Sequence, residues 1–286
     1  MSRRIRFCIC NETFQGWKWD RTCEAIALLG YDAIELAPFT ITPDVRLADS
    51  GMRTSVRETA RAAGLEVVGL HWLLVSPDGL SITSNDPATR ASTADYLAAL
   101  VDFCSDVGGS VMVLGSPSQR RLPAGETEAT VLNRLEEVLR PALRRAHEQK
   151  VTICLEPLPP PEADFILTLE QAAAAIRSIG HPSLKTILDV KSAAGDKAPA
   201  EDLIREYSHL IAHVHANDSN LGYPGSGDTD FVPILNALDE VGYRGAVSIE
   251  VFNYMPDPIT IAREGLAYLK SCLQIVKRKR CGADSP

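Results

Sequence analysis

The sequence predicts an α/β protein built as a single (β/α)8 barrel, and three observations support this. Eight short apolar runs, typical of buried parallel strands, alternate with eight helical patterns, and no long linker separates them. The 286 residues suit one barrel of about 250 residues better than two domains. The structural alternative is an open doubly wound sheet. No GxGxxG follows the first run and no GxxxxGK[ST] occurs, so its nucleotide-binding variants lose support.

Each expected element follows from its local pattern. Strands are predicted at 5–10, 32–37, 65–72, 110–116, 151–157, 184–190, 211–217 and 246–252. Helices are predicted at 20–30, 54–64, 87–108, 130–149, 168–180, 199–209, 231–242 and 257–276. Several helical patterns begin at Asp, Ser, Thr or Pro and several end at Gly, the residues preferred at those ends. We expect the barrel to span 1–278 and the basic, then polar, segment 279–286 to be a frayed tail, with a phosphate-binding or interaction tail as the alternative.

Composition limits the classes of partner. The net charge of −8 argues against a nucleic-acid or acidic-membrane surface, and no run of 18 apolar residues predicts a membrane span. The apolar stretch near the N-terminus is too short for a signal peptide. Seven cysteines without CxxC pairs are typical of a reducing compartment, so we expect a cytoplasmic protein with a small-molecule partner.

Four polar residues end the last four strand-like runs. Glu156, Asp189, His215 and Glu250 close VTICLE, LKTILD, LIAHVH and GAVSIE, with gaps of 33, 26 and 35 residues. A single such residue is more often a cap or an ion-pair partner. Four at consecutive strand ends would meet at one mouth of the barrel, where three carboxylates repel one another unless a cation holds them. The oxygen-rich set with one imidazole therefore predicts a divalent-cation site.

The segments LEPLPPPE, ILDVKSA, HVHANDSNLGYPGSGDTDFVPIL and VSIEVF carry a more specific resemblance. The chain resembles the xylose isomerase-like TIM barrel superfamily, in particular its sugar phosphate isomerase/epimerase branch with the ketose 3-epimerases. The resemblance implies that Glu156, Asp189, His215 and Glu250 bind one divalent ion, Mn²⁺ first and Mg²⁺ or Co²⁺ as alternatives. It also implies a homo-oligomer, a dimer or tetramer.

The implied activity is isomerisation or epimerisation of a ketose or keto-sugar. The carbonyl oxygen and a neighbouring hydroxyl would bind the metal, which stabilises the enediolate formed on loss of a carbon-bound proton. Glu156 and Glu250 would be the catalytic pair, one removing a proton and the other returning one.

Further residues near these strand ends are candidate substrate contacts. They are His71, Trp72, Glu162, Lys191 and Asn217. The alternatives are a buried structural pair for His71 and Trp72, a solvated loop charge for Glu162, and a salt bridge to a site carboxylate for Lys191. His213 should lie one layer deeper than His215, as a core or supporting histidine. Gln119, Arg120 and Arg121 offer polar groups to a sugar or phosphate, with a solvated loop as the alternative for the two arginines.

Two positions depart from the ketose 3-epimerase pattern. Ser192 stands where those enzymes typically carry a histidine, and Leu221 where they carry an arginine. A metal-dependent lyase on the same barrel, a dehydratase or a 3-keto-glycoside-cleaving enzyme, is therefore the main alternative function. An endonuclease IV-like phosphodiesterase is disfavoured because Asp228 and Asp230 have no matching histidine nearby. A non-catalytic subunit is disfavoured by the complete ligand quartet.

Overall fold

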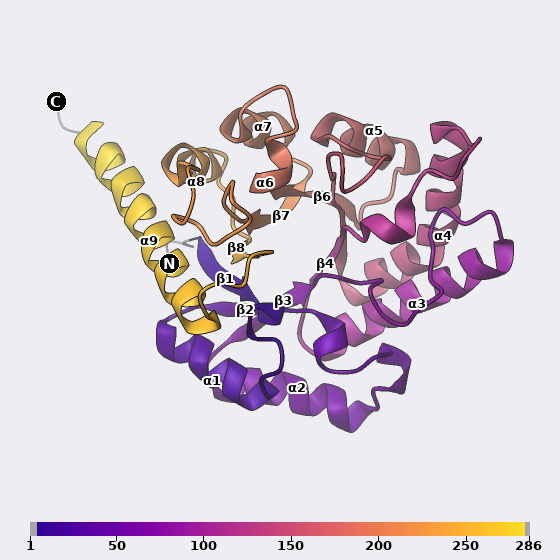
Figure 1. Ribbon diagram of the computed structural model, residues 1–286, viewed down its shortest axis with the longest axis horizontal. Coiled ribbons are helices and arrows are strands. Elements are labelled where there is room, and N and C mark those ends of the chain that lie inside the picture. Colours follow the sequence, from indigo (N-terminus) through magenta and orange to yellow (C-terminus); the bar gives the residue numbers. More distant parts are fainter. Residues whose placement is uncertain (1–4, 284–286) are drawn as a thin grey trace.

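Eight parallel strands close into a barrel in which each strand pairs with its neighbours along the chain and β8 pairs with β1. The computed structural model describes residues 5–283. Figure 1 shows the strands at the centre of the molecule and the helices around them. The predicted single (β/α)8 TIM barrel is thus confirmed.

The strands are short and largely buried, as their apolar sequences require. They are β1 (Arg6–Cys10), β2 (Ala33–Leu36), β3 (Glu66–Leu70), β4 (Val111–Leu114), β5 (Thr152–Leu155), β6 (Leu184–Asp189), β7 (Ile211–Ala216) and β8 (Ala246–Ile249). Every strand lies within one of the predicted runs. The polar residues at or directly after the ends of β5–β8 therefore meet at the carboxyl mouth of the barrel.

The helices cover the outside of the barrel. They are α1 (Trp19–Leu29), α2 (Ser50–Ala62), α3 (Pro87–Asp106), α4 (Glu128–Gln149), α5 (Leu169–Ile179), α6 (Val190–Ala193), α7 (Ala200–Tyr207), α8 (Phe231–Glu240) and α9 (Pro258–Ala283). Short 3-10 helices η1 (Asn11–Phe14), η2 (Pro38–Thr40), η3 (Val45–Leu47) and η4 (Pro117–Arg120) lie in the loops after β1, β2 and β4. Helix α2 begins four residues before its predicted start, because the Asp49 carboxylate accepts a hydrogen bond from the Met52 amide and caps the earlier turn.

Helix α9 closes the outer ring by packing against both α8 and α1 (Figure 1). It continues to Ala283, five residues into the segment predicted to be a frayed tail, and 284–286 lie outside the described residues. Within the described part of the chain, no helix has both the length and the apolar character needed to cross a bilayer.

Candidate active site

The four polar strand ends converge in the structure. One ligand atom each from Glu156, Asp189, His215 and Glu250 lies within 4.8 Å of the others, and all four residues are buried. Strand pairing accounts for part of this arrangement, since Asp189 on β6 is the direct register partner of His215 on β7. Ligands bound to one cation at about 2.1 Å lie about 3 to 4 Å apart, so small side-chain movements would complete such a site.

A glycine makes room for Glu156. A Cβ atom on Gly115, which follows β4, would lie 2.1 Å from Glu156 Oε2, far inside van der Waals contact. Below the same glutamate, the buried guanidinium of Arg120 donates to the carbonyl oxygens of Gly115 (2.6 Å), Glu156 (2.5 Å) and Phe165 (3.3 Å). Arg120 therefore joins the loops after β4 and β5 and fixes the backbone from which Glu156 projects.

Asp189 is fixed by the chain that follows it and by β7. Its Oδ1 accepts a hydrogen bond from the Ser192 amide (2.7 Å), and its Oδ2 accepts one from the Asn217 side chain (2.6 Å). The other end of the Asn217 amide accepts a hydrogen bond from the Lys191 backbone N–H (2.8 Å). Asn217 thus orients a candidate metal ligand.

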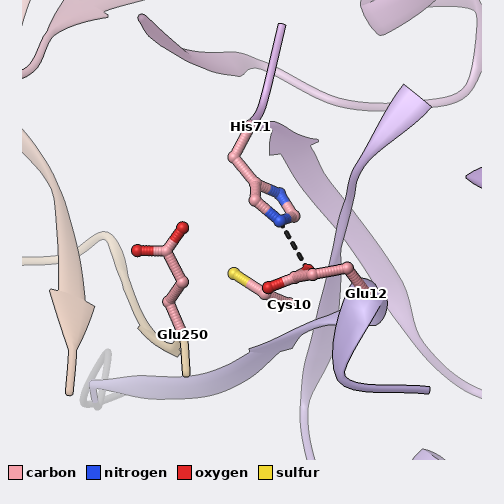
Figure 2. Close-up of side chains that lie close together, drawn as sticks. All are labelled: Cys10, Glu12, His71 and Glu250. Carbon is pink, nitrogen blue, oxygen red and sulfur yellow. Dashed lines mark hydrogen bonds and ion pairs between the residues drawn. The ribbon is translucent and has the colours of Figure 1, made fainter. Parts of the chain in front are cut away.

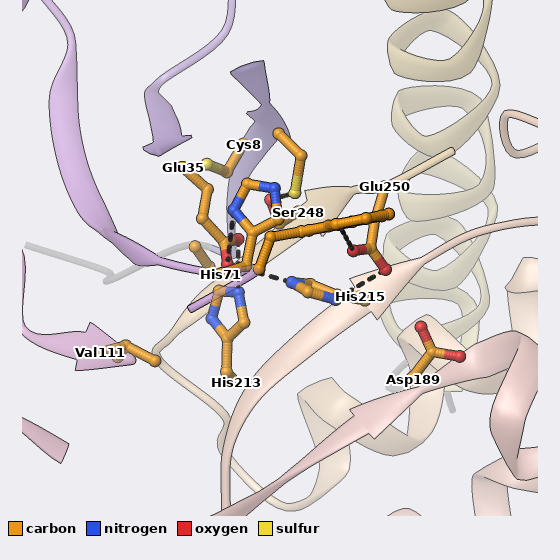
Figure 3. Close-up of polar contacts among 12 residues, drawn as sticks. Cys8, Glu35, His71, Val111, Asp189, His213, His215, Ser248 and Glu250 are labelled. Carbon is orange, nitrogen blue, oxygen red and sulfur yellow. Dashed lines mark hydrogen bonds and ion pairs between the residues drawn. The ribbon is translucent and has the colours of Figure 1, made fainter. Parts of the chain in front are cut away.

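Glu35, at the third position of β2, connects three histidines beneath the quartet (Figure 3). Its two oxygens lie 2.8 Å from His213 Nε2 and 3.1 Å from His215 Nε2, and Oε1 is 3.7 Å from His71 Nδ1. His213 therefore lies behind His215, bonded to the same carboxylate, as expected for a supporting histidine. Glu35 itself was not predicted; the only signal in the sequence is a lone glutamate inside the apolar run AIEL.

The electrostatics of the quartet show an excess of buried negative charge. Burial, with the carboxylates of Asp189 and Glu250, raises the pKa of Glu156 to about 8. Burial and Glu250 also raise the pKa of Asp189. Burial alone would lower the pKa of His215, but Glu250 and Glu35 raise it well above its usual value. Burial would also raise the pKa of Glu250, but His215 and His71 lower it. The three raised pKa values indicate a demand for positive charge that a divalent cation would meet.

The donor atoms also fit a cation. His215 Nε2 faces Glu35, whereas its buried Nδ1 makes no hydrogen bond and lies 3.1 Å from Glu250 Oε2. A carboxylate behind a histidine fixes the ring orientation and tautomer, which leaves the opposite nitrogen lone pair for a metal. Glu156, Asp189, His215 and Glu250 could together hold one such ion.

The remaining predicted site residues lie around this centre. Trp72, whose backbone is left-handed at φ 53°, donates from its indole to Glu250 Oε1 at 3.2 Å. Lys191 Nζ pairs with Glu162 at 2.6 Å, not with a quartet carboxylate, and lies 4.3 Å from the centre of the Phe252 ring. His71 is buried and pairs with Glu12, a residue that sequence reasoning missed.

Three other sequence-based expectations are refined. Arg120, predicted as a possible contact to a sugar or phosphate, is instead 1% exposed and donates hydrogen bonds to three backbone carbonyls. Ser192 is buried, and its hydroxyl has no hydrogen-bond partner. The Leu221 side chain is 44% exposed, while its carbonyl accepts hydrogen bonds from the amides of Phe252 and Asn253 and so ties the loops after β7 and β8 together.

Several known proteins are similar to this chain. A ketose 3-epimerase of Arthrobacter globiformis is 26% identical over 229 residues, which are 78% of this chain and 74% of that protein. A provisionally named hydroxypyruvate isomerase of Mus musculus is 31% identical over 257 residues, 85% of each protein. The structure of an L-ribulose 3-epimerase matches with a TM-score of 0.85 at 22% identity over 99% of both chains.

A further solved structure, 3-keto-D-glucoside 4-epimerase from E. coli, matches with a TM-score of 0.81 at 21% identity, over 94% of this chain and 100% of that one. At these identities the two structural matches show the fold. A family model described as xylose isomerase-like TIM barrel matches residues 23–272. Because that model runs from within α1 to within α9, the chain belongs to the xylose isomerase-like TIM barrel family.

Proposed function

We propose that this protein is a divalent-metal-dependent sugar isomerase or epimerase that acts on a ketose or keto-sugar. The observation that carries the proposal is the convergence of four buried ligand atoms, three from carboxylates and one from imidazole, at the mouth of the barrel. The named activities of its relatives, ketose 3-epimerase and L-ribulose 3-epimerase among them, support the same class of reaction.

Glu156, Asp189, His215 and Glu250 would hold one ion, Mn²⁺ first and Mg²⁺ or Co²⁺ as alternatives. When bound, such a cation polarises a substrate carbonyl and stabilises the negative charge that develops beside it.

Glu156 and Glu250 are the proposed proton carriers. Each comes from a different strand and has a second carboxylate oxygen beyond the one that a cation would take. One glutamate removes the proton from the carbon next to the carbonyl, and the other returns a proton. Return to the opposite face of the same carbon inverts it, whereas return to the neighbouring carbon moves the carbonyl. The Trp72 indole, which donates to Oε1 at 3.2 Å, holds the Glu250 carboxylate in place for this step.

The five predicted substrate contacts remain proposals with distinct roles. Trp72 hydrogen-bonds Glu250, a proposed proton carrier, and Asn217 hydrogen-bonds Asp189, a proposed metal ligand. Both residues would position those carboxylates as well as border the substrate. The Lys191–Glu162 ion pair offers a positive and a negative group to sugar oxygens. His71 lies deeper, beside Glu12.

A lyase acting on the same kind of substrate is the second candidate. The observation in its favour is that Ser192 and Leu221 replace the histidine and the arginine that the ketose 3-epimerase pattern places there. Loss of the same carbon-bound proton can then expel a group from the next carbon and leave an unsaturated product.

The test is exchange in D₂O. The Mn²⁺-loaded protein is incubated with D-fructose, D-psicose and a 3-keto-glucoside, and products are followed by NMR. Deuterium at an inverted or relocated centre supports the proposal, and an unsaturated product supports the lyase. Glu156→Gln and Glu250→Gln should each lower turnover by about 10²- to 10⁴-fold. The control Glu264→Gln changes a half-exposed glutamate on α9 and should leave turnover unchanged. Full activity in Glu250→Gln would refute the assigned site.

We also propose a cytoplasmic location and a homo-oligomer. The six described cysteines are all free and buried, which suits a reducing compartment. Sedimentation of the purified protein checks for the dimer or tetramer.

A further inference from the structure

A second buried acid–base pair lies beside the quartet, and the proposed reaction does not use it. Glu12 is on η1, directly after β1, and is 1% exposed. Its Oε2 lies 2.6 Å from Nε2 of His71, which follows β3. Because a carboxylate only accepts hydrogen bonds, the His71 ring donates to it from Nε2 when Glu12 is ionised.

The Glu12–His71 pair lies next to Glu250, one of the two proposed proton carriers. One atom each from Cys10, Glu12, His71 and Glu250 lies within 4.8 Å of the others. Figure 2 shows the side chains of Glu12, His71 and Glu250 pointing toward a common centre, with the Cys10 sulfur between the two carboxylates in this view. Glu250 thus belongs both to the quartet and to this second cluster.

One oxygen of the pair has no partner. Glu12 Oε1 is buried and accepts no hydrogen bond from any described residue. A buried carboxylate oxygen that accepts no hydrogen bond is destabilising, because burial has removed the water that would otherwise donate to it. The site therefore lacks a hydrogen-bond donor, and a ligand hydroxyl is a group that would supply one.

A second cation fits this cluster less well. The nearest oxygen and nitrogen of Glu12 and His71 are already bonded to each other, and Cys10 Sγ lies 3.4 Å from the Ser248 hydroxyl. Two atoms of the pair, Oε1 of Glu12 and Nδ1 of His71, then make no hydrogen bond. Because Nδ1 lies 3.7 Å from Glu35 Oε1, the Glu12 Oε1 atom is an acceptor site and not part of a completed ligand set.

We propose that Glu12, held by His71, is a substrate-binding residue whose Oε1 accepts a hydrogen bond from a sugar hydroxyl beyond the reacting carbons. This inference rests on the proposed function and narrows its substrate class. A neutral polyhydroxylated ketose or keto-sugar supplies the missing donor. A short keto-acid such as hydroxypyruvate has its one hydroxyl on a reacting carbon, and its carboxylate supplies only acceptors. Glu12 would then favour sugars over such acids.

The substitution Glu12→Gln tests this directly. If His71 continues to donate to the side-chain oxygen, the amide nitrogen takes the place of Oε1 with nearly the same shape. The charged acceptor then becomes a neutral donor, which forms a weaker hydrogen bond with a sugar hydroxyl. Binding of D-fructose, D-psicose and their single-deoxy analogues to the Mn²⁺-loaded wild type, Glu12→Gln and Glu264→Gln is measured by calorimetry. We expect removal of one particular hydroxyl to weaken binding about 10-fold or more in the wild type and in Glu264→Gln, and less than about 3-fold in Glu12→Gln.

Two further measurements keep the test decisive. Wild-type crystals soaked with D-fructose should place a sugar oxygen about 3 Å from Glu12 Oε1, whether or not the variant folds. Mn²⁺ stoichiometry should be one per chain in both the wild type and Glu12→Gln. Two ions per wild-type chain, falling to one in Glu12→Gln, would overturn the inference in favour of a metal site.

The possible failures are distinguishable. Equal deoxy penalties in the wild type and Glu12→Gln, together with normal exchange in D₂O, would overturn the role of Glu12 and leave the proposed function intact. Glu12-dependent sugar binding without any exchange or elimination would overturn the proposed function and leave the hydroxyl site intact. Failure of every sugar to bind the wild type at millimolar concentrations would overturn both.

Discussion

Substitution of Gly115 by alanine should disable the candidate metal site without altering any ligand. The new Cβ would lie 2.1 Å from Glu156 Oε2 and 3.3 Å from Glu156 Cδ. Ordinary van der Waals contact is about 3.5 Å, so the carboxylate must retreat by about 1.4 Å. Metal–ligand distances tolerate only about 0.2 Å, so Glu156 would be lost as a ligand. We expect Mn²⁺ affinity to fall at least about 100-fold, since even substitutions behind a ligand cost about 10- to 100-fold.

The fold should survive this change. Gly115 is not among the glycines with positive φ, so alanine can adopt its backbone conformation, and such replacements often add about 0.4–1 kcal/mol of stability. Calorimetric titration with Mn²⁺ and thermal melts in EDTA separate the two effects. Gly51→Ala is the matched control, because its Cβ meets only the end of the Asp49 side chain, at 3.3 Å. Wild-type Mn²⁺ affinity in Gly115→Ala would refute the assignment of Glu156 as a ligand.

Three further predictions concern the groups around the quartet. Glu35→Gln should lower Mn²⁺ affinity about 10- to 100-fold and the free energy of unfolding by about 3–5 kcal/mol, because Glu35 holds two histidines by hydrogen bonds. Metal titration measures the first effect and urea unfolding the second. Wild-type values in both assays would contradict this role of Glu35. In metal-free protein the free energy of unfolding should fall as pH rises from about 4.5 to 8, because folded Glu156 keeps its proton up to a pKa of about 8 while the unfolded chain releases it near 4.5, so the native state binds more protons in this window. Melts in EDTA should show this slope in the wild type and a flatter one in Glu156→Gln; identical slopes would exclude Glu156 as the source. Arg120→Met should lower the free energy of unfolding by about 3 kcal/mol or more, since three backbone carbonyls lose their donor. Arg121→Met, at a half-exposed side chain, should change it by less than about 0.5 kcal/mol. Equal losses in urea unfolding would contradict the structural role of Arg120.

The strand ends were predictable because two signals coincide in the sequence. Glu156, Asp189, His215 and Glu250 each stop an apolar run, and parallel strands bring such ends to one mouth. Those signals depend only on local composition and on the order of elements. The barrel and the convergence of the quartet could therefore be derived without coordinates.

The residues behind the quartet could not be derived in this way. Glu35 lies inside an apolar strand and Glu12 inside a 3-10 turn, and neither position has a periodic pattern that marks its direction. Arg120 lies in a polar loop, and the composition of that loop predicts a solvent-exposed side chain. In the structure the side chain is buried and hydrogen-bonds to backbone carbonyls. Partners of this kind are determined by how β2, β3 and β7 come together across the barrel, which is tertiary information.

The hydrogen bonds of Glu35 to His213 and His215 join residues 178 and 180 positions apart in the chain. We expect contacts of such large sequence separation to form late in folding, because closing a loop of this length has a high entropic cost. We therefore expect the support that Glu35 gives to the cation site to be absent from the folding transition state. A bound ion is expected to slow unfolding while leaving the folding rate unchanged, so its benefit would be a longer lifetime of the native barrel. Stopped-flow folding and unfolding with and without Mn²⁺ would show on which of the two rates the metal acts.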